Sequence, residues 1–176
     1  MIKVEITDEM TKRAKQNAKD LGVLKNSILM GQGNFTGFLG EELVKSFFKY
    51  NAFVCPLDCE NSKDYDIVYN SKKYDIKTKL TTKEPLPEYD CSIASYNTVQ
   101  KCDGYIFVRI QKDKEDNLVC GWILGWMDKE EYFQNAEYWP KGKIDPSNGY
   151  RVKASCYNVK IKDLKNVEEL KNDSKT

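Results

Sequence analysis

The stretch that decides the fold is Asp64-Tyr-Asp-Ile-Val-Tyr-Asn-Ser-Lys-Lys-Tyr-Asp-Ile-Lys-Thr-Lys79. Residues 67–69 and 74–78 are rich in the apolar, aromatic and β-branched side chains that favour strands. The polar residues 70–73 between them are typical of a turn. The stretch therefore predicts a β-hairpin. Side chains alternate between the two faces of a strand, so Asp75 and Lys77 are expected to share one face.

Pairing Tyr69 with Tyr74 across the turn places Asp66 opposite Lys77. Because this loop holds an even number of residues, Asp66, Asp75 and Lys77 then project from one face of the hairpin. The other face carries the apolar and aromatic residues Ile67, Tyr69, Tyr74 and Ile76. Two acids and a lysine on one face are costly as a purely structural feature, but they suit a divalent-metal site with a charged helper.

This arrangement resembles the PD-(D/E)XK nuclease superfamily, whose signature is an acid leading one strand and acid-x-Lys in the next strand of a hairpin. Asp66 matches the first acid, and Asp75-Ile76-Lys77 matches the second element. Tyr65 stands where the family often has proline, at a variable position. The same tripeptide pattern recurs at residues 163–165, 169–171 and 173–175 without an apolar hairpin, so the sequence context selects residues 75–77.

A third acid is expected on the helix before the hairpin, because members of the superfamily often carry an active-site glutamate there, just after a glycine. The apolar spacing of residues 39–48 predicts a helix over residues 37–50 with one buried side. Gly40-Glu41 fits the family pattern, and Glu41 borders the buried side. Glu42 is expected in solvent near Lys45. The alternative for Glu41 is a surface ion pair.

The resemblance implies an α/β fold with a restriction-endonuclease-like core, in which helices flank a central mixed β-sheet. We expect one domain over residues 1–176, with an N-terminal strand and helix extension at 1–36, the core at 37–170 and a frayed tail at 171–176. The small nuclease-like proteins of phages and prokaryotes are the members that the sequence resembles most.

The resemblance also implies Mg²⁺- or Mn²⁺-dependent hydrolysis of DNA phosphodiester bonds, with endonuclease action expected. Asp66, Asp75 and the Ile76 backbone carbonyl are the expected metal ligands, and Glu41 would bind a metal-bound water or a second ion. Lys77 would act on the attacking water and the phosphate. Further candidates for nucleic-acid contacts are Lys79, Asn34 and Lys73.

Composition excludes several other classes of protein. The 176 residues include 40% hydrophobic residues, which suits a globular chain, and the net charge of +1 does not describe a polycation. Histidine is absent, which excludes histidine general bases and histidine-metal nucleases. No apolar run is long enough to span a membrane, and no signal peptide is recognised. We therefore expect a cytoplasmic protein without a membrane partner, in the host cytoplasm if a phage encodes it.

Six cysteines are most simply reduced thiols in that compartment. The alternative is a four-thiolate zinc site formed by Cys55, Cys59, Cys91 and Cys102, although their spacing is not that of a zinc ribbon.

The other expected elements are read from local patterns. Strands are expected at residues 1–6, 89–95, 104–110 and 118–127, with Trp122 and Trp126 on one face of the last, where core packing is favoured over base stacking. Helices are expected at residues 8–21, 128–133 and 164–170. Residues 138–149 are expected to form a loop, and residues 150–159 an edge strand.

Three functional alternatives remain open at this point. The chain could be a nucleic-acid-binding module that kept the fold and lost turnover, an accessory or anti-defence protein that uses the fold for protein interaction, or an enzyme that cleaves RNA. The sequence also leaves open whether the chain forms a homodimer.

Overall fold

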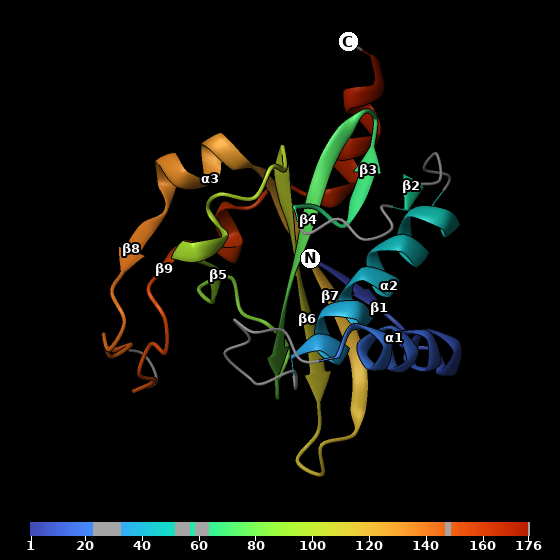
Figure 1. Cartoon of the computed structure of the whole chain (residues 1–176), viewed down its shortest axis with the longest axis horizontal. Helices are drawn as coiled ribbons and strands as arrows, with labels where there is room; N and C mark the ends of the chain where they lie inside the picture. The colour runs from blue at the N-terminus through green and yellow to red at the C-terminus, as the bar shows by residue number, and fades with distance from the viewer. Residues whose placement is uncertain (23–32, 52–56, 59–63, 147–148, 176) are drawn as a thin grey trace.

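The computed structural model describes residues 1–22, 33–51, 57–58, 64–146 and 149–175 (Figure 1). Its larger sheet contains β1 (Ile2–Val4), β2 (Leu57–Asp58), β3 (Ile67–Tyr69), β4 (Lys72–Thr81), β6 (Gly104–Lys112) and β7 (Leu118–Asp128). The strand order is β1-β7-β6-β4-β3-β2. β4 and β6 run parallel, whereas the other neighbouring strands are antiparallel. The sheet is therefore mixed, as the family resemblance implied.

The larger sheet separates two apolar layers. Helices α1 (Asp8–Leu21) and α2 (Asn34–Tyr50) lie on one side, as Figure 1 shows at the right. On the other side lie α3 (Lys129–Asn135) and a second sheet with the order β5-β9-β8, formed by β5 (Asp90–Ala94), β9 (Cys156–Lys160) and β8 (Glu137–Trp139). Each side buries its own hydrophobic cluster. The mixed α/β class is thus confirmed.

The β3–β4 hairpin forms as predicted, but its register differs from the expected one. The strands pair Ile67 with Tyr74 and Tyr69 with Lys72, so the turn is only Asn70-Ser71. Both turn residues have positive φ, at 49° and 61°, as a tight type I′ hairpin turn requires. Continued by one residue, this register places Asp66 beside Asp75, and the expected pairing of Asp66 with Lys77 is wrong.

The two N-terminal helices follow their sequence signals closely. α1 has the predicted bounds: the Thr7 side chain accepts a hydrogen bond from the Met10 amide, and Gly22 ends the helix with a φ of 66°. α2 begins at Asn34, three residues before the expected start. It packs its buried residues Leu39, Leu43, Val44, Phe47 and Phe48 into the cluster on the helical side of the sheet.

β6 and β7 form the central antiparallel pair, and a β-bulge divides them. Phe107 pairs with Gly125 while Val108 pairs with Ile123, so Leu124 is an extra residue in β7. An extra residue reverses which face the following side chains point to. Trp122 therefore lies in the cluster of the second sheet and Trp126 in the cluster of the helices. The prediction that they share a face is wrong, but both are buried in the core.

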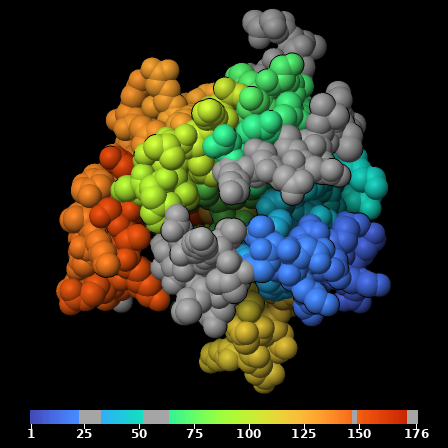
Figure 2. Space-filling view, in the orientation of Figure 1, coloured from blue at the N-terminus to red at the C-terminus, as the bar shows by residue number. Residues whose placement is uncertain are grey.

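The C-terminal half departs most from the sequence-based expectation. β9 is the middle strand of the second sheet, so the expected edge strand at residues 150–159 is wrong. Part of the expected loop at 138–149 belongs to β8 instead. The expected terminal helix is a 3₁₀-helix at Val167–Lys175. The turn between β6 and β7 projects as a lobe at the bottom of the molecule (Figure 2).

Two expectations from composition bear on the whole chain. Within the described residues, no helix is both long enough and apolar enough to cross a membrane. Cys91, Cys102, Cys120 and Cys156 are free thiols, whereas Cys55 and Cys59 lie outside the described residues. The four-thiolate zinc alternative therefore stays a hypothesis.

Candidate functional site

The candidate site lies beyond the end of β3, where no strand among the described residues pairs with that edge of β4. The Asp66 amide donates to the Tyr74 carbonyl over 2.9 Å. Beyond that bond, a side chain takes over the pairing with β4: Asp66 Oδ2 accepts a hydrogen bond from the Ile76 amide at 2.6 Å. In an extended strand the N–H and C=O of one residue point to the same edge. The Ile76 carbonyl is therefore directed to the edge on which Asp66 lies.

Asp75, Lys77 and Gln100 form a closed set of contacts beside that edge. Asp75 is only 4% exposed. Its Oδ2 lies 2.6 Å from Lys77 Nζ, and its Oδ1 accepts a hydrogen bond from Gln100 Nε2 at 2.9 Å. Lys77 Nζ donates to Gln100 Oε1, also at 2.9 Å. Lys77 is thus held in one place by an acid and an amide.

Sequence reasoning did not single out Gln100. It precedes β6 and lies 25 residues from Asp75 along the chain, in a stretch with no recognisable motif. Only the parallel pairing of β4 with β6 brings the two together. No local pattern could have identified it.

The third acid, Glu41, reaches the site from α2. Its carboxylate is 19% exposed and lies 3.7 Å from Lys45 Nζ, one turn along the same helix. The expected environment of Glu42 is wrong. The Glu42 side chain is 11% exposed, and its carboxylate accepts a hydrogen bond from Arg13 Nε on α1 at 2.7 Å. This ion pair joins the two helices, so Glu42 does not stand in solvent near Lys45.

The three acids are close enough to perturb one another. Burial raises the pKa of Glu41 to about 7, and the negative charge of Asp75 adds to the rise, while Lys45 opposes it. Burial also raises the pKa of Asp66 to about 8, reinforced by Asp75 and Glu41 and opposed by the Ile76 amide. Carboxyl groups with raised pKa values are favourable partners for a cation, because a cation offsets both causes.

The acids do not form a closed ligand cage. Among the residues that the structure describes, no group of three or more His, Cys, Asp or Glu side chains converges closely enough to hold a metal ion. Asp75 faces Lys77, and Asp66 faces the Ile76 amide. The acids therefore supply suitable oxygen donors along the edge of β4. Their side chains would have to move closer together to bind one metal ion.

The pH dependence of stability tests this electrostatic picture. A carboxyl group with a raised pKa binds more protons in the folded than in the unfolded chain, so its contribution is greatest at low pH and is lost as the pH rises. For Asp66, stability is lost between its ordinary pKa of 3.8 and its raised pKa of about 8. For Glu41, it is lost between the ordinary pKa of 4.5 and the raised pKa of about 7. In EDTA, the melting temperature of Asp66→Asn should fall less between pH 5 and 9 than that of the parent.

Asparagine at position 66 can still accept the Ile76 amide, so this change removes mainly the charge. Glu115→Gln in the exposed β6–β7 turn serves as the control and should follow the parent. Parallel curves for the parent and Asp66→Asn would show that Asp66 carries no unfavourable charge in the folded protein.

Gly40 sets the distance between α2 and β4, and hence the position of Glu41. A methyl group at Gly40 would overlap Thr78 Oγ1 and come within 2.9 Å of Thr78 Cγ2. Gly40→Ala should therefore cost about 1–3 kcal/mol of stability, and it should lower any activity that depends on Glu41. Gly37 in the same helix has open space around it. Gly37→Ala should stabilise the protein by up to about 1 kcal/mol. Urea unfolding of both variants tests the pair, and equal effects would contradict the close approach.

The three further candidates for nucleic-acid contact lie apart from one another. Lys79 extends from β4 into a cavity next to Lys77. Lys73 lies on the exposed part of the hairpin, with Nζ 5.0 Å from the centre of the Tyr65 ring. Asn34 donates its side-chain amide to the Gly22 carbonyl at 2.6 Å. Of the three, only Lys79 adjoins the candidate site in the described contacts.

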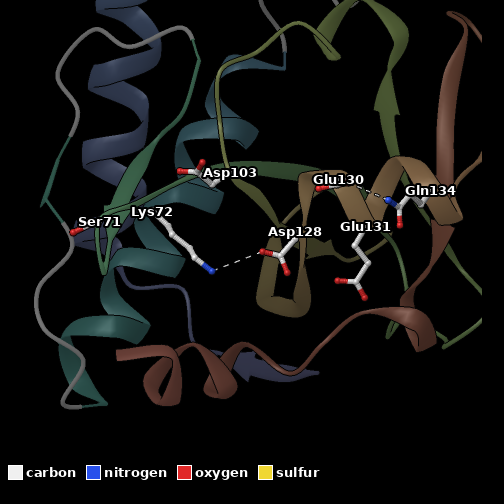
Figure 3. A pocket seen from close by; sticks show the side chains of 7 residues that line it. All are labelled: Ser71, Lys72, Asp103, Asp128, Glu130, Glu131 and Gln134. Carbon is white, nitrogen blue, oxygen red and sulfur yellow. Dashed lines mark hydrogen bonds and ion pairs between the residues drawn. The ribbon is translucent and has the colours of Figure 1, made fainter. Parts of the chain in front are cut away.

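A larger hollow lies at the other end of β4, near the hairpin turn. It has a volume of about 680 Å³, and Figure 3 shows the residues that line it: Ser71, Lys72, Asp103, Asp128, Glu130, Glu131 and Gln134. Its acids are partly neutralised, since Lys165 pairs with Asp128 and Glu131, and Lys72 lies 3.9 Å from Asp128. None of the four candidate catalytic residues lines it.

Comparisons with known proteins neither support nor oppose the family resemblance. A scan against protein-family models finds no match, and a search of curated proteins finds no relative. The functional argument therefore depends on the residues and geometry of the chain itself.

Proposed function

We propose that this chain is a metal-dependent nuclease that hydrolyses DNA phosphodiester bonds, with a restriction-endonuclease-like core and a site of the PD-(D/E)XK kind. One observation carries the proposal: Lys77 is paired with the buried Asp75, beside the Asp66 carboxylate, at the edge of β4 beyond the end of β3. A buried Asp-x-Lys pair has no evident structural advantage there, because two well-packed apolar residues would serve as well.

The oxygen donors at this edge fit Mg²⁺ or Mn²⁺. Asp66, Asp75 and the Ile76 carbonyl would hold the ion, and Glu41 would contact one of its waters. Carboxylates and carbonyls are the ligands that both ions prefer, and a cation would relieve the repulsion between Glu41, Asp66 and Asp75. When bound, such an ion lowers the pKa of water and polarises the phosphoryl group.

The chain's own residues would do the remaining work. Lys77 is restrained by Asp75 and Gln100, so its ammonium group is positioned without further loss of side-chain freedom. It would orient the attacking water and offset the negative charge that develops on the phosphate. Glu41, on a rigid helix, would hold the water against the same edge of β4. Gln100 would keep both Asp75 and Lys77 in place.

An activity panel tests the proposal. Linear, circular, single-stranded and branched DNA, together with a labelled RNA, are each incubated with the protein in Mg²⁺, Mn²⁺ or EDTA. We expect cleavage of DNA in either metal and none in EDTA. Cleavage of RNA but of no DNA substrate would show that the protein is a ribonuclease instead.

A catalytically silent protein that uses the same fold to bind nucleic acid, or as an anti-defence interaction surface, is the second candidate. It is favoured by the lack of a preformed three-acid metal group among the described residues and by the tight pairing of Asp75 with Lys77. Plasmid nicking separates the two candidates. Tight DNA binding without nicking in Mg²⁺ or Mn²⁺ would select the silent protein.

A further inference from the structure

A small cavity opens between the larger sheet and β5, directly beside Lys77. Its volume is about 110 Å³. A water molecule takes roughly 30 Å³ in the liquid, so the cavity has space for one tetrahedral oxyanion but not for a nucleobase with its sugar. Its charged and hydroxyl-bearing lining residues are Lys77, Thr78, Lys79, Asp90, Ser92 and Arg109. Three of these six side chains are cationic.

Two of the cations are neighbours, and neither forms an ion pair with a carboxylate among the described residues. Lys79 and Arg109 are directly paired positions on the parallel strands β4 and β6. Both turn to the same backbone oxygen, the Asp90 carbonyl, at 3.5 Å from Lys79 Nζ and 3.0 Å from Arg109 Nη2. The Asp90 carboxylate instead holds Lys160 at 2.7 Å. Like charges side by side on a sheet are unfavourable unless something else lies between them.

The donors of this pair are also incompletely used. Arg109 Nε is buried and has no hydrogen-bond partner within the described part of the chain, whereas Nη1 and Nη2 donate to the Leu80 and Asp90 carbonyls. Lys79 Nζ donates to Ser92 Oγ at 2.6 Å, so its ammonium turns inward although the residue as a whole is exposed. Burial lowers the pKa of both Lys79 and Arg109, and for Lys79 the charge of Arg109 adds to this effect. An anion in the cavity would satisfy the free donor and offset the repulsion.

We propose that Lys79 and Arg109 form a phosphate-binding subsite that holds a backbone phosphate of DNA next to the one that reacts. The inference deepens the proposed function and rests on it for the identity of the polymer. Guanidinium groups match the geometry of phosphate oxygens. Lys77 and Lys79 point to the same face of β4, about 7 Å apart along the strand. This distance is comparable with the spacing of successive phosphates on a nucleic-acid strand.

Equilibrium binding in EDTA tests the subsite without turnover. The affinity of a fluorescein-labelled duplex is measured by anisotropy over a series of salt concentrations, for the parent, Arg109→Gln, Lys79→Gln and the control Lys15→Gln. Lys15 is exposed on α1, on the opposite side of the sheet. Each lost phosphate contact lowers the slope of log affinity against log salt by about 1. For Arg109→Gln and Lys79→Gln we expect a lower salt slope and weaker binding. For Lys15→Gln we expect the parental slope and affinity.

Circular dichroism establishes that each variant is folded. If Arg109→Gln does not fold, because Arg109 also bonds to backbone carbonyls, Lys79→Gln and Arg109→Lys carry the test. Cavity variants that retain the parental salt slope would overturn the subsite, and so would a parent that does not bind DNA. Inorganic phosphate is also tested as a competitor. If it displaces the labelled duplex as effectively as an unlabelled duplex does, the cavity is a site for free phosphate instead. If the cavity variants bind DNA weakly but the parent never cleaves, the subsite stands and the nuclease proposal fails.

Discussion

Lys77→Ala is expected to abolish DNA cleavage, with a loss of at least about 100-fold. The reason is geometric: the Lys77 ammonium is fixed between Asp75 and Gln100. Metal binding should persist, because Lys77 donates no ligand. The melting temperature in EDTA should fall, since Asp75 keeps its buried charge and loses its cationic partner. Cleavage rates and calorimetric titration with Mn²⁺ measure the two effects separately.

Lys15→Ala is the matched control for this substitution. It removes the same charge from an exposed position on α1, far from the hairpin in the fold, and it should leave cleavage, metal binding and stability unchanged. Cleavage by Lys77→Ala at the parental rate would mean that the proposed mechanism is wrong.

Glu41→Gln should sharply lower cleavage when Mg²⁺ is limiting, with a smaller loss at saturating Mg²⁺. Glutamine keeps the size and helix propensity of the side chain but removes the charge that would hold a metal-bound water. Stability without metal should not fall and should rise slightly at pH 8. At that pH, the buried Glu41 carboxyl, whose pKa is raised to about 7, is ionised at some cost. The dependence of the cleavage rate on Mg²⁺ concentration is the measurement.

Glu42→Gln is the control for Glu41→Gln, because it is one residue away on the same helix. The structure changes what this control should show. Glu42 holds Arg13 on α1, so its substitution should cost up to about 1 kcal/mol of stability and leave cleavage intact. If Glu42→Gln lost cleavage while Glu41→Gln stayed active, the third acid would be Glu42, and the assignment to Glu41 would be wrong.

Helix α1 and the face pattern of β4 could be predicted from sequence because local signals specify them. Thr7 and Gly22 fix the two ends of α1. The alternation of apolar and polar residues fixes which faces Tyr74, Asp75, Ile76 and Lys77 occupy. The observed hairpin register differs from the predicted one by two residues because the Asn70-Ser71 turn is shorter than the polar stretch around it. A shift of two residues keeps every side chain on its face, so the expected grouping of Asp75 with Lys77 did not depend on the exact register.

The remaining features depend on contacts between distant parts of the chain. The bulge at Leu124 separates Trp122 from Trp126 and has no local signature beyond Gly125. β9 becomes a central strand because β5 and β8 pair with its two edges, and neither pairing is encoded nearby. Gln100 reaches Asp75, and Arg109 lies beside Lys79, only through the parallel pairing of β4 with β6. Periodicity within one segment carries no information about such pairings.

The central claim is that the acids at the edge of β4 beyond β3 support metal-dependent cleavage of DNA. Nicking of supercoiled plasmid by the parent and by Asp75→Asn, each in Mg²⁺ and in EDTA and purified side by side, tests it most directly. Asparagine keeps the shape of Asp75 and a carbonyl oxygen for Gln100, but it removes the charge. The account predicts nicked and linear plasmid with the parent in Mg²⁺ alone, and intact plasmid in the other three reactions. Equal nicking by the parent and Asp75→Asn, or no nicking by the parent in Mg²⁺, would contradict it.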